Sequence, residues 1–220
     1  MTYARGIALI ACFLGSAVVT PLFAQTCFGT PSRGGVSADY GRVSFGNTVG
    51  ATGTLAGSRT AYSVGVHSVT LGSKSKGYGG DGRFAVRIGA GRVSICPAVG
   101  LGFGQSTWNA STADLKSTTL TGRAGIGFGL EQSGVGKLSI IPFVAVQYAF
   151  AAVKYNVTGS DVDTQTTGDT LSGAGVQFGL LARYHIVYVG FIGDRDLTAS
   201  SPSAVRGILG VTFPMSIKKD

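Results

Sequence analysis

The chain alternates large apolar residues with small ones at every second position over much of its length. In residues 93–104 the odd positions hold Val, Ile, Pro, Val, Leu and Phe, and the even positions hold Ser, Cys, Ala and three Gly. Similar alternation recurs at 124–130, 138–150, 176–184 and 205–213. A period of two is that of a β-strand, because successive side chains point to opposite faces. The sequence therefore predicts an all-β protein.

Composition excludes several other classes. Glycine accounts for 36 of the 220 residues, and 13% of the residues are charged. A helical domain would not tolerate this glycine density, because each interior Gly costs about 1 kcal/mol relative to Ala. A disordered chain would carry more charge and fewer apolar residues. Past residue 24, no apolar run reaches the roughly 18 residues that a transmembrane helix needs.

The two faces of the expected strands differ in residue size. One face carries Val, Ile, Leu and aromatic residues, and the other carries mostly Gly, Ala, Ser and Thr with a few Arg and Gln. A soluble sandwich would present a polar outer face, whereas small residues suit the inside of a narrow barrel. The large apolar face would then meet lipid, where every backbone group must be paired. We therefore predict a closed antiparallel up-and-down transmembrane β-barrel.

Segments of about the 9–11 residues that span a bilayer recur along the chain. We expect ten strands, at residues 36–46, 48–57, 61–71, 82–91, 93–106, 117–131, 138–154, 171–184, 186–194 and 204–213. An eight-strand barrel without the first two segments is the alternative, with the N-terminal segment in the lumen or the periplasm. Short turns at 91–92, 132–137 and 184–185 alternate with longer links at 72–81, 107–116, 155–169 and 195–203. This asymmetry is typical of bacterial barrels, whose short turns are periplasmic.

Residues 1–24 are expected to form a secretory signal peptide. Arg5 precedes an apolar stretch, Pro21 interrupts it, and Ala24 supplies a small residue before a cleavage site. An uncleaved anchor helix and lipoprotein processing at Cys12 are the alternatives. The expected organisation is a signal peptide at 1–24, a periplasmic segment at 25–35, a barrel at 36–213 and a tail at 214–220.

Export makes the cysteines and the net charge informative. Cys27 and Cys96 would remain in an oxidising compartment, where one disulfide between them could tie the N-terminal segment across the periplasmic mouth. Two buried free thiols are the alternative. The formal net charge of the chain is +8. For an exported protein, anionic lipid headgroups or small anions are more suitable partners than nucleic acid.

The last expected strand ends in an aromatic residue. Residues 205–213 read Val-Arg-Gly-Ile-Leu-Gly-Val-Thr-Phe. Together with the alternation over residues 34–213, this resembles the small bacterial outer-membrane β-barrel superfamily, which includes opacity-type and outer-membrane-protein-A-like barrels. The resemblance implies that Phe213 belongs to a signal that the barrel-assembly machinery recognises. The chain departs from that pattern by seven further residues, Pro214 to Asp220.

Polar residues on the small face are the candidate functional residues. Those expected to face the lumen are Arg42, His67, Arg87, Arg123, Gln147, Gln177, Asp194 and Arg206. They could form a salt-bridged plug or, if the arginines lack acidic partners, a weakly anion-selective lining. Aromatic residues near strand ends fit interfacial girdles; these are Tyr148, Phe150, Tyr155, Tyr184, Tyr188 and Phe213.

No catalytic constellation stands out. His67 and Ser68 are adjacent, but neighbours on a strand point to opposite faces and cannot act together as base and nucleophile. The sequence offers no metal cluster and no cofactor motif. We expect a structural or surface-interaction barrel whose outer loops could contact an extracellular ligand, with no catalysis. A narrow pore for small solutes or anions is the alternative, and a secreted β-sandwich is the second.

Overall fold

The computed structural model describes residues 33–43, 46–56, 59–71, 75–88, 93–109, 113–130, 132–133, 138–159, 162–197 and 204–214. The expected signal peptide and Cys27 lie outside these residues. Within them, no helix is long and apolar enough to cross a membrane.

Strands make up almost all of the described chain. Their bounds are β1 (Arg33–Val43), β2 (Gly46–Ala56), β3 (Thr60–Leu71), β4 (Ser75–Val86), β5 (Val93–Asn109), β6 (Ala113–Leu130), β7 (Gln132–Ser133), β8 (Leu138–Gly159), β9 (Val162–Tyr184), β10 (Val187–Asp196) and β11 (Ala204–Pro214).

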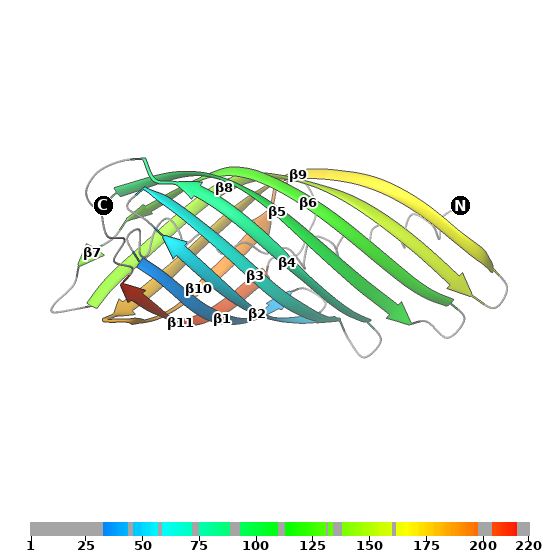
Figure 1. The fold of residues 1–220 in the computed structure, drawn as a ribbon, viewed down its shortest axis with the longest axis horizontal. Helices are drawn as coiled ribbons and strands as arrows, with labels where there is room; N and C mark the ends of the chain where they lie inside the picture. The colour runs from blue at the N-terminus through cyan, green and yellow to red at the C-terminus, as the bar shows by residue number, and fades with distance from the viewer. Residues whose placement is uncertain are drawn as a thin grey trace, which may run out of the picture.

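The long strands form one closed antiparallel ring. Sequential neighbours pair from β1 to β6 and from β8 to β11, while the β6–β8 and β1–β11 pairings close the circle (Figure 1). The two-residue β7 pairs with the start of β8 and takes no part in closure. The prediction of a ten-strand barrel is confirmed. The eight-strand and β-sandwich alternatives are wrong, because β1 and β2 are full members of a ring without a free edge.

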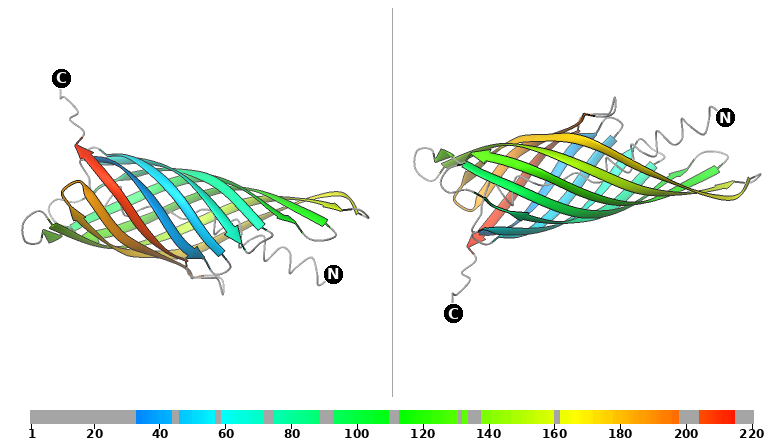
Figure 2. Two further views of the ribbon diagram at one scale, coloured as in Figure 1. Left: turned by 90° about the horizontal axis from the view of Figure 1, so that it is seen from below. Right: turned by 90° about the horizontal axis from the view of Figure 1, so that it is seen from above.

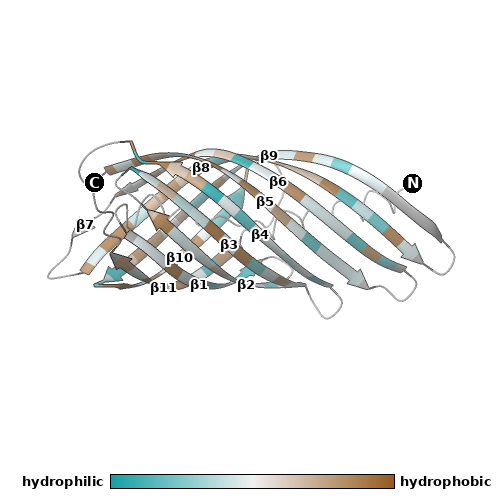
Figure 3. Cartoon of the chain, viewed as in Figure 1, coloured by the Kyte–Doolittle hydropathy of each residue, from teal (hydrophilic) through white to brown (hydrophobic). Residues whose placement is uncertain are grey.

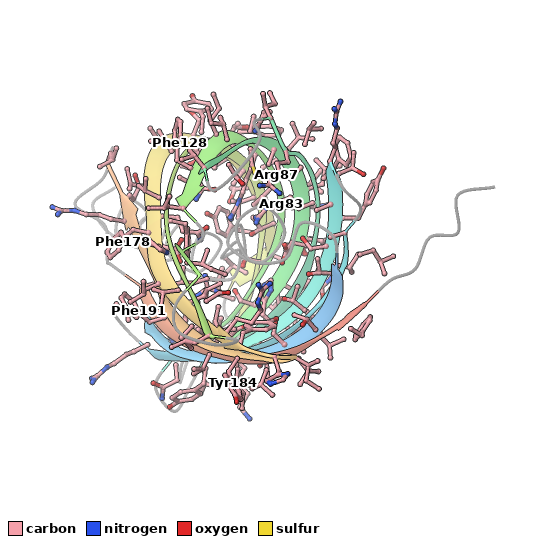
Figure 4. The ribbon with its side chains drawn as sticks, turned by 90° about the vertical axis from the view of Figure 1, so that its left-hand side faces the viewer. Arg83, Arg87, Phe128, Phe178, Tyr184 and Phe191 are labelled. Atoms are coloured by element: carbon pink, nitrogen blue, oxygen red, sulfur yellow. The ribbon has the colours of Figure 1, made fainter. Side chains whose placement is uncertain are left out.

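Side chains alternate between the outside and the inside of the ring. On β5, Leu101 is 68% exposed and points outward, whereas Cys96 is fully buried. Polar and apolar residues alternate along the strands in Figure 3. Viewed along the barrel, Phe128, Phe178 and Phe191 lie outside, while Arg83 and Arg87 point into the interior (Figure 4). The interior therefore holds charged side chains, as the small-residue face predicted. It also holds a cluster of large apolar residues that the alternation did not predict: Ile141, Phe143, Leu181, Tyr188, Ile192 and Ile208.

One side of the barrel is much taller than the other. Strands β5, β6, β8 and β9 have 17, 18, 22 and 23 residues, whereas β1 and β11 have 11 each. The β8–β9 hairpin therefore extends well beyond the barrel wall at the end opposite the C-terminal end of β11 (Figure 2). Much of the expected links at 72–81, 107–116 and 155–169 is strand, because these polar residues continue the ladders of their neighbours.

Several glycines lie directly opposite an aromatic residue on the next strand. A Cβ at Gly122 would enter the ring of its register partner Phe150 on the outer face. Gly179 is covered in the same way by Phe143 on the inner face. Each glycine leaves a shallow slot in which the opposite ring lies flat, which stabilises cross-strand pairing. The further pairs of this kind are Gly193 with Phe178 and Gly210 with Tyr188.

Candidate functional site

A charged cluster occupies the interior, centred on Arg206 of β11. Its Nη2 donates to Oδ2 of Asp194 over 3.0 Å, and its Nη1 lies 3.7 Å from Oδ2 of Asp39. Gln177, which is fully buried, donates from Nε2 to the other oxygen of Asp194 over 2.7 Å. Burying these charges is tolerable because they are paired and hydrogen-bonded.

Strand register places these partners together. Arg206 lies opposite Gly41 on β1 and Ile192 on β10, so Asp39 and Asp194 are its diagonal neighbours on either side. Diagonal positions are within reach of a long side chain. Gly41 has no side chain, and a Cβ there would overlap Arg206 Cγ. The arginine therefore lies across the backbone of β1 and reaches both carboxylates.

Glycines make room for the acidic residues as well. A Cβ on Gly50 would lie 2.7 Å from Oδ1 of Asp39, and a Cβ on Gly65 would lie 3.0 Å from Oδ1 of Asp81. Both glycines are direct register partners of these acids. Glycine on the inner face therefore creates the space that the charged side chains occupy.

A separate contact between a basic and an acidic side chain joins β3 and β4. Nδ1 of His67 lies 3.8 Å from Oδ1 of Asp81. Ser68 faces outward, and its hydroxyl donates to the carbonyl oxygen of Gly77 over 3.2 Å. His67 and Ser68 therefore point to opposite sides of the wall. Glu131, the sole glutamate of the sequence, lies outside the described residues.

The β4–β6 wall carries an excess of positive charge. Arg83 and Arg123 are both register partners of Gly100, which lies between them on β5, and both face inward. The charges of Arg83, Asp81, Asp194 and Arg206 all act on Arg123, and its Nε has no hydrogen-bond partner among the described residues. Arg87 points into the interior at the end of β4 (Figure 4). We call Arg83, Arg87 and Arg123 on this side of the lumen the arginine wall. On the β9–β11 side, by contrast, the charged residues form ion pairs.

The expected lumen residues did not include three members of the interior charge network. Asp39, Asp81 and Arg83 face inward with the expected residues, and Asp39 and Arg83 are buried. Alternation on β1 would have identified Asp39, because it shares its face with Ser37 and Gly41 opposite Val36 and Tyr40. Asp81 fell in an expected loop. Gln147 faces the interior at an intermediate exposure.

The outer surface has an apolar belt of bilayer height. On β5 the outward residues from Val93 to Phe103 are apolar or Pro, and Gln105 and Thr107 follow them. On β6 the belt runs from Leu130 back to Leu120, with Thr118 and Lys116 beyond it. Each stretch has about the length that a tilted strand needs to cross a bilayer. A closed ring with this exterior is a membrane-spanning barrel.

Comparison with known proteins finds other membrane barrels. No family model and no curated protein matches the chain. The translocator domain of the autotransporter NalP from Neisseria meningitidis is similar at 14% identity and a TM-score of 0.47, over 97% of this chain and 98% of that one. The N-terminal barrel domain of Pseudomonas aeruginosa OprF (12% identity, TM-score 0.35) covers 83% of this chain and 98% of its own.

A major outer membrane protein from Thermus thermophilus is similar over 82% of this chain and 99% of that chain, at 12% identity and a TM-score of 0.41. At these identities the likeness concerns the fold alone, and the closed ring with its apolar belt carries the assignment. The described strands form a small, membrane-spanning ten-strand β-barrel.

The strands extend much further beyond the apolar belt at one end of the barrel than at the other. The C-terminal end of β11 lies at the end where the strands stop near the belt, opposite the long β5–β6 and β8–β9 hairpins. In bacterial outer-membrane barrels the longer excursions are extracellular.

Two expected girdle residues and one expected lumen residue are placed differently. Arg42 is exposed and faces outward, because it continues the outward series of Val36, Ala38 and Tyr40. Tyr155 and Tyr188 are buried and face inward. Strand β8 continues past 154 with unchanged alternation, and Val187 and Val189 take the outward positions around Tyr188.

The other aromatic residues face outward. Tyr148, Phe150, Tyr184 and Phe213 are all exposed on the outer surface. Tyr184 and Phe213 lie near the end of the barrel at which β11 terminates, close to the level at which interfacial aromatics meet lipid headgroups. Cys96 is buried on the inner face of β5, three residues from the start of that strand.

Proposed function

We propose that this outer-membrane barrel is a surface-interaction protein that presents its tall β5–β9 sheet to the outside. The supporting observation is strand length. A bilayer requires about 9–11 residues per strand, whereas β8 and β9 have 22 and 23. At about 3.3 Å per residue, the surplus projects the hairpin by roughly 40 Å along the strand direction. A barrel that served as a membrane plug alone would not need this extension.

The projecting sheet has its own core. Val153 and Tyr155 are buried on its inner face, and Leu115, Ala151 and Leu171 pack against them. The β8–β9 ladder remains paired from Leu138 and Tyr184 out to Gly159 and Val162, with one irregularity at 157–159. Packing and continuous pairing favour a stiff platform, which suits a surface that contacts a partner.

The interior supports a structural role rather than catalysis. Arg206, Asp39, Asp194 and Gln177 are bonded to one another across neighbouring strands. Such contacts tie β9, β10, β11 and β1 together at the seam where the ring closes. We propose that the barrel is not an enzyme, and the opposite orientations of His67 and Ser68 support this.

Shortening the hairpin tests the proposal. Residues 154–168 would be replaced by a two-residue turn. Lys154 lies opposite Gly168 in the β8–β9 register, so the deletion removes both members of each residue pair and leaves the rest of the ladder in register. Purified barrels with the full and the shortened hairpin would be probed on arrays of glycans and extracellular-matrix proteins. We expect the full barrel to be retained on at least one surface and the shortened barrel to be lost from it.

Folding of both proteins is checked by their migration on unboiled gels, since a folded barrel runs differently from the boiled chain. Equal retention of the two folded barrels, or retention of neither, would contradict a surface-interaction role for the hairpin.

A narrow anion-conducting pore is the second candidate, and the arginine wall favours it. Arg83, Arg87 and Arg123 face the lumen on one side, with Asp81 as the nearby acid, and excess positive charge in a narrow channel favours anions. Planar-bilayer conductance in a salt gradient would measure this. An anion-biased reversal potential that falls in Arg83→Gln/Arg123→Gln supports the pore, and the absence of conductance steps excludes it.

Export and assembly complete the proposal. We propose that residues 1–24 are removed, and sequencing of the mature N-terminus should begin at Gln25. Phe213 is exposed on the outer face near the periplasmic end of β11, a position suited to recognition by the barrel-assembly machinery. A Phe213→Ala variant should then accumulate as unfolded chain in the periplasm.

A further inference from the structure

The outward-facing cations of the described strands all lie at the outer edge of the apolar belt. They come from five strands and are exposed; they are Arg42, Lys76, Lys116, Lys154 and Arg195. The one acidic residue facing outward on these strands is Asp114, further out along β6. The other strand cations with described side chains face the interior. This segregation concentrates positive charge where the barrel leaves the outer leaflet.

Three of these cations are close neighbours. Lys76 and Lys116 are both register partners of Thr107, one on each side of β5, so their Cα atoms lie about 10 Å apart at the usual strand spacing. Lys116 pairs with Asn156, which makes Lys154 its diagonal neighbour on β8. We call Lys76, Lys116 and Lys154 the lysine patch. Thr107 and Asn156 add polar groups between the cations.

The lysine patch lacks acidic partners. Among the described residues, no salt bridge joins any of the three ammonium groups to a carboxylate. Three exposed like charges on adjacent strands repel one another, and the patch therefore favours a multiply charged anion. Ammonium groups bind phosphate through short, charge-assisted hydrogen bonds.

An apolar surface lies directly below the patch. Phe103 on β5, Leu120 on β6 and Phe150 on β8 are exposed and point outward. Between this surface and the lysines, the hydroxyl of Tyr78 donates to Oε1 of Gln105 on the outer wall. A ligand here would meet hydrocarbon on one side and cations on the other.

From this arrangement we propose that the lysine patch binds the phosphate groups of an outer-leaflet lipid whose acyl chains lie on Phe103, Leu120 and Phe150. Clustered basic residues at a membrane surface attract anionic headgroups, and here the cations continue the apolar belt. The inference rests on the barrel's place in the membrane. Because shortening the hairpin would also remove Lys154, the lipid test uses point variants that keep the hairpin intact.

The test measures binding of lipid A with and without its phosphates to the folded barrel in neutral detergent, by native mass spectrometry. The wild-type barrel should prefer the phosphorylated form. Each lysine near a charged surface contributes about a fivefold gain in affinity, so Lys76→Gln/Lys116→Gln/Lys154→Gln should weaken binding of phosphorylated lipid A by about 100-fold. Binding of the dephosphorylated lipid should not change. Lys116→Gln alone should lose about fivefold.

The control is Arg42→Gln/Arg195→Gln, which removes outward cations on β1 and β10, away from the patch. This variant should keep the preference for phosphorylated lipid. The proposed site would be overturned if the triple lysine variant kept its preference for phosphorylated lipid A. It would also be overturned if the control variant lost as much affinity as the triple variant. Inorganic phosphate is the second probe. If it binds the patch as tightly as phosphorylated lipid A does, the acyl chains contribute nothing and the lipid assignment fails.

Discussion

The guanidinium of Arg206 donates a hydrogen bond to Asp194 over 3.0 Å inside the barrel, between side chains that are diagonal neighbours on β11 and β10. The arginine side chain is 2% exposed, and Asp39 approaches it from the opposite side. This contact lies next to the β1–β11 pairing, where the first and last strands of the ring meet. The buried contacts of Arg206 therefore link β10, β11 and β1 at the point where the ring closes.

Replacing Arg206 should destabilise the barrel. Arg206→Met leaves two inward carboxylates without their shared cation, and breaking a buried pair in this way costs about 3–5 kcal/mol. Urea unfolding in lipid vesicles, followed by tryptophan fluorescence of Trp108, would measure the free energy of unfolding.

Neutralising the acids should restore part of that stability. In Arg206→Met/Asp39→Asn/Asp194→Asn the uncompensated charges are gone, so the triple variant should be more stable than Arg206→Met alone. Arg195→Met removes an exposed outward arginine and should change the free energy of unfolding by less than about 0.5 kcal/mol. A triple variant that is less stable than Arg206→Met would show that the acids have other essential partners.

Gly41 should be intolerant of any side chain. Its Cβ would overlap Arg206 and lie 2.6 Å from the carbonyl oxygen of Val205. Gly41→Ala should therefore destabilise the barrel by about 1–3 kcal/mol, the usual cost of overpacking. Gly53 on β2 is the matched control, because a Cβ there meets nothing within 4 Å. Gly53→Ala should be neutral or slightly stabilising in the same unfolding assay; equal losses at both positions would refute the steric explanation.

The inner and outer glycine–aromatic pairs should respond differently to alanine. At Gly122 the new methyl would meet the ring of Phe150, which faces lipid and can swing away. At Gly179 it would meet Phe143, which is 6% exposed, and would lie 2.5 Å from the carbonyl oxygen of Phe191. We expect Gly179→Ala to cost about 2–3 kcal/mol and Gly122→Ala about 1 kcal/mol or less.

The free energies of unfolding of the two variants would be compared in the same vesicles. A Gly122→Ala barrel that is as unstable as Gly179→Ala would show that the outer ring is held as rigidly as the inner one.

Cys96 is a free, buried thiol in the structure. Because Cys27 lies outside the described residues, the Cys27–Cys96 disulfide remains a prediction. Peptide mapping without reduction should yield one cross-linked species that contains both cysteines. The bridge would close a loop of about 70 residues and stabilise the fold by a few kcal/mol, so Cys96→Ala should lower the midpoint of unfolding. Wild-type protein treated with reductant should match Cys96→Ala. Recovery of both cysteines as alkylated thiols would rule the bridge out.

Much of the architecture could be predicted from alternation because alternation is local. Val99, Leu101 and Phe103 differ in size from Gly100 and Gly102, and this difference alone indicates which side of the strand meets lipid. The length of the alternating segments then predicted the number of strands. Turn composition was a poorer guide: residues 162–170 are rich in Thr, Asp and Gly, yet they form strand because residues 151–159 offer a ladder.

The sequence by itself determined that the chain is a barrel with an apolar exterior and a small-residue interior, since side-chain direction repeats every two residues. Only the tertiary structure decided that Arg206 lies between Asp39 and Asp194, that Arg83 and Arg123 flank Gly100, and that Lys76, Lys116 and Lys154 are neighbours. These contacts depend on register between strands distant in sequence. Register is set by pairing around the whole closed ring, so no local pattern encodes it.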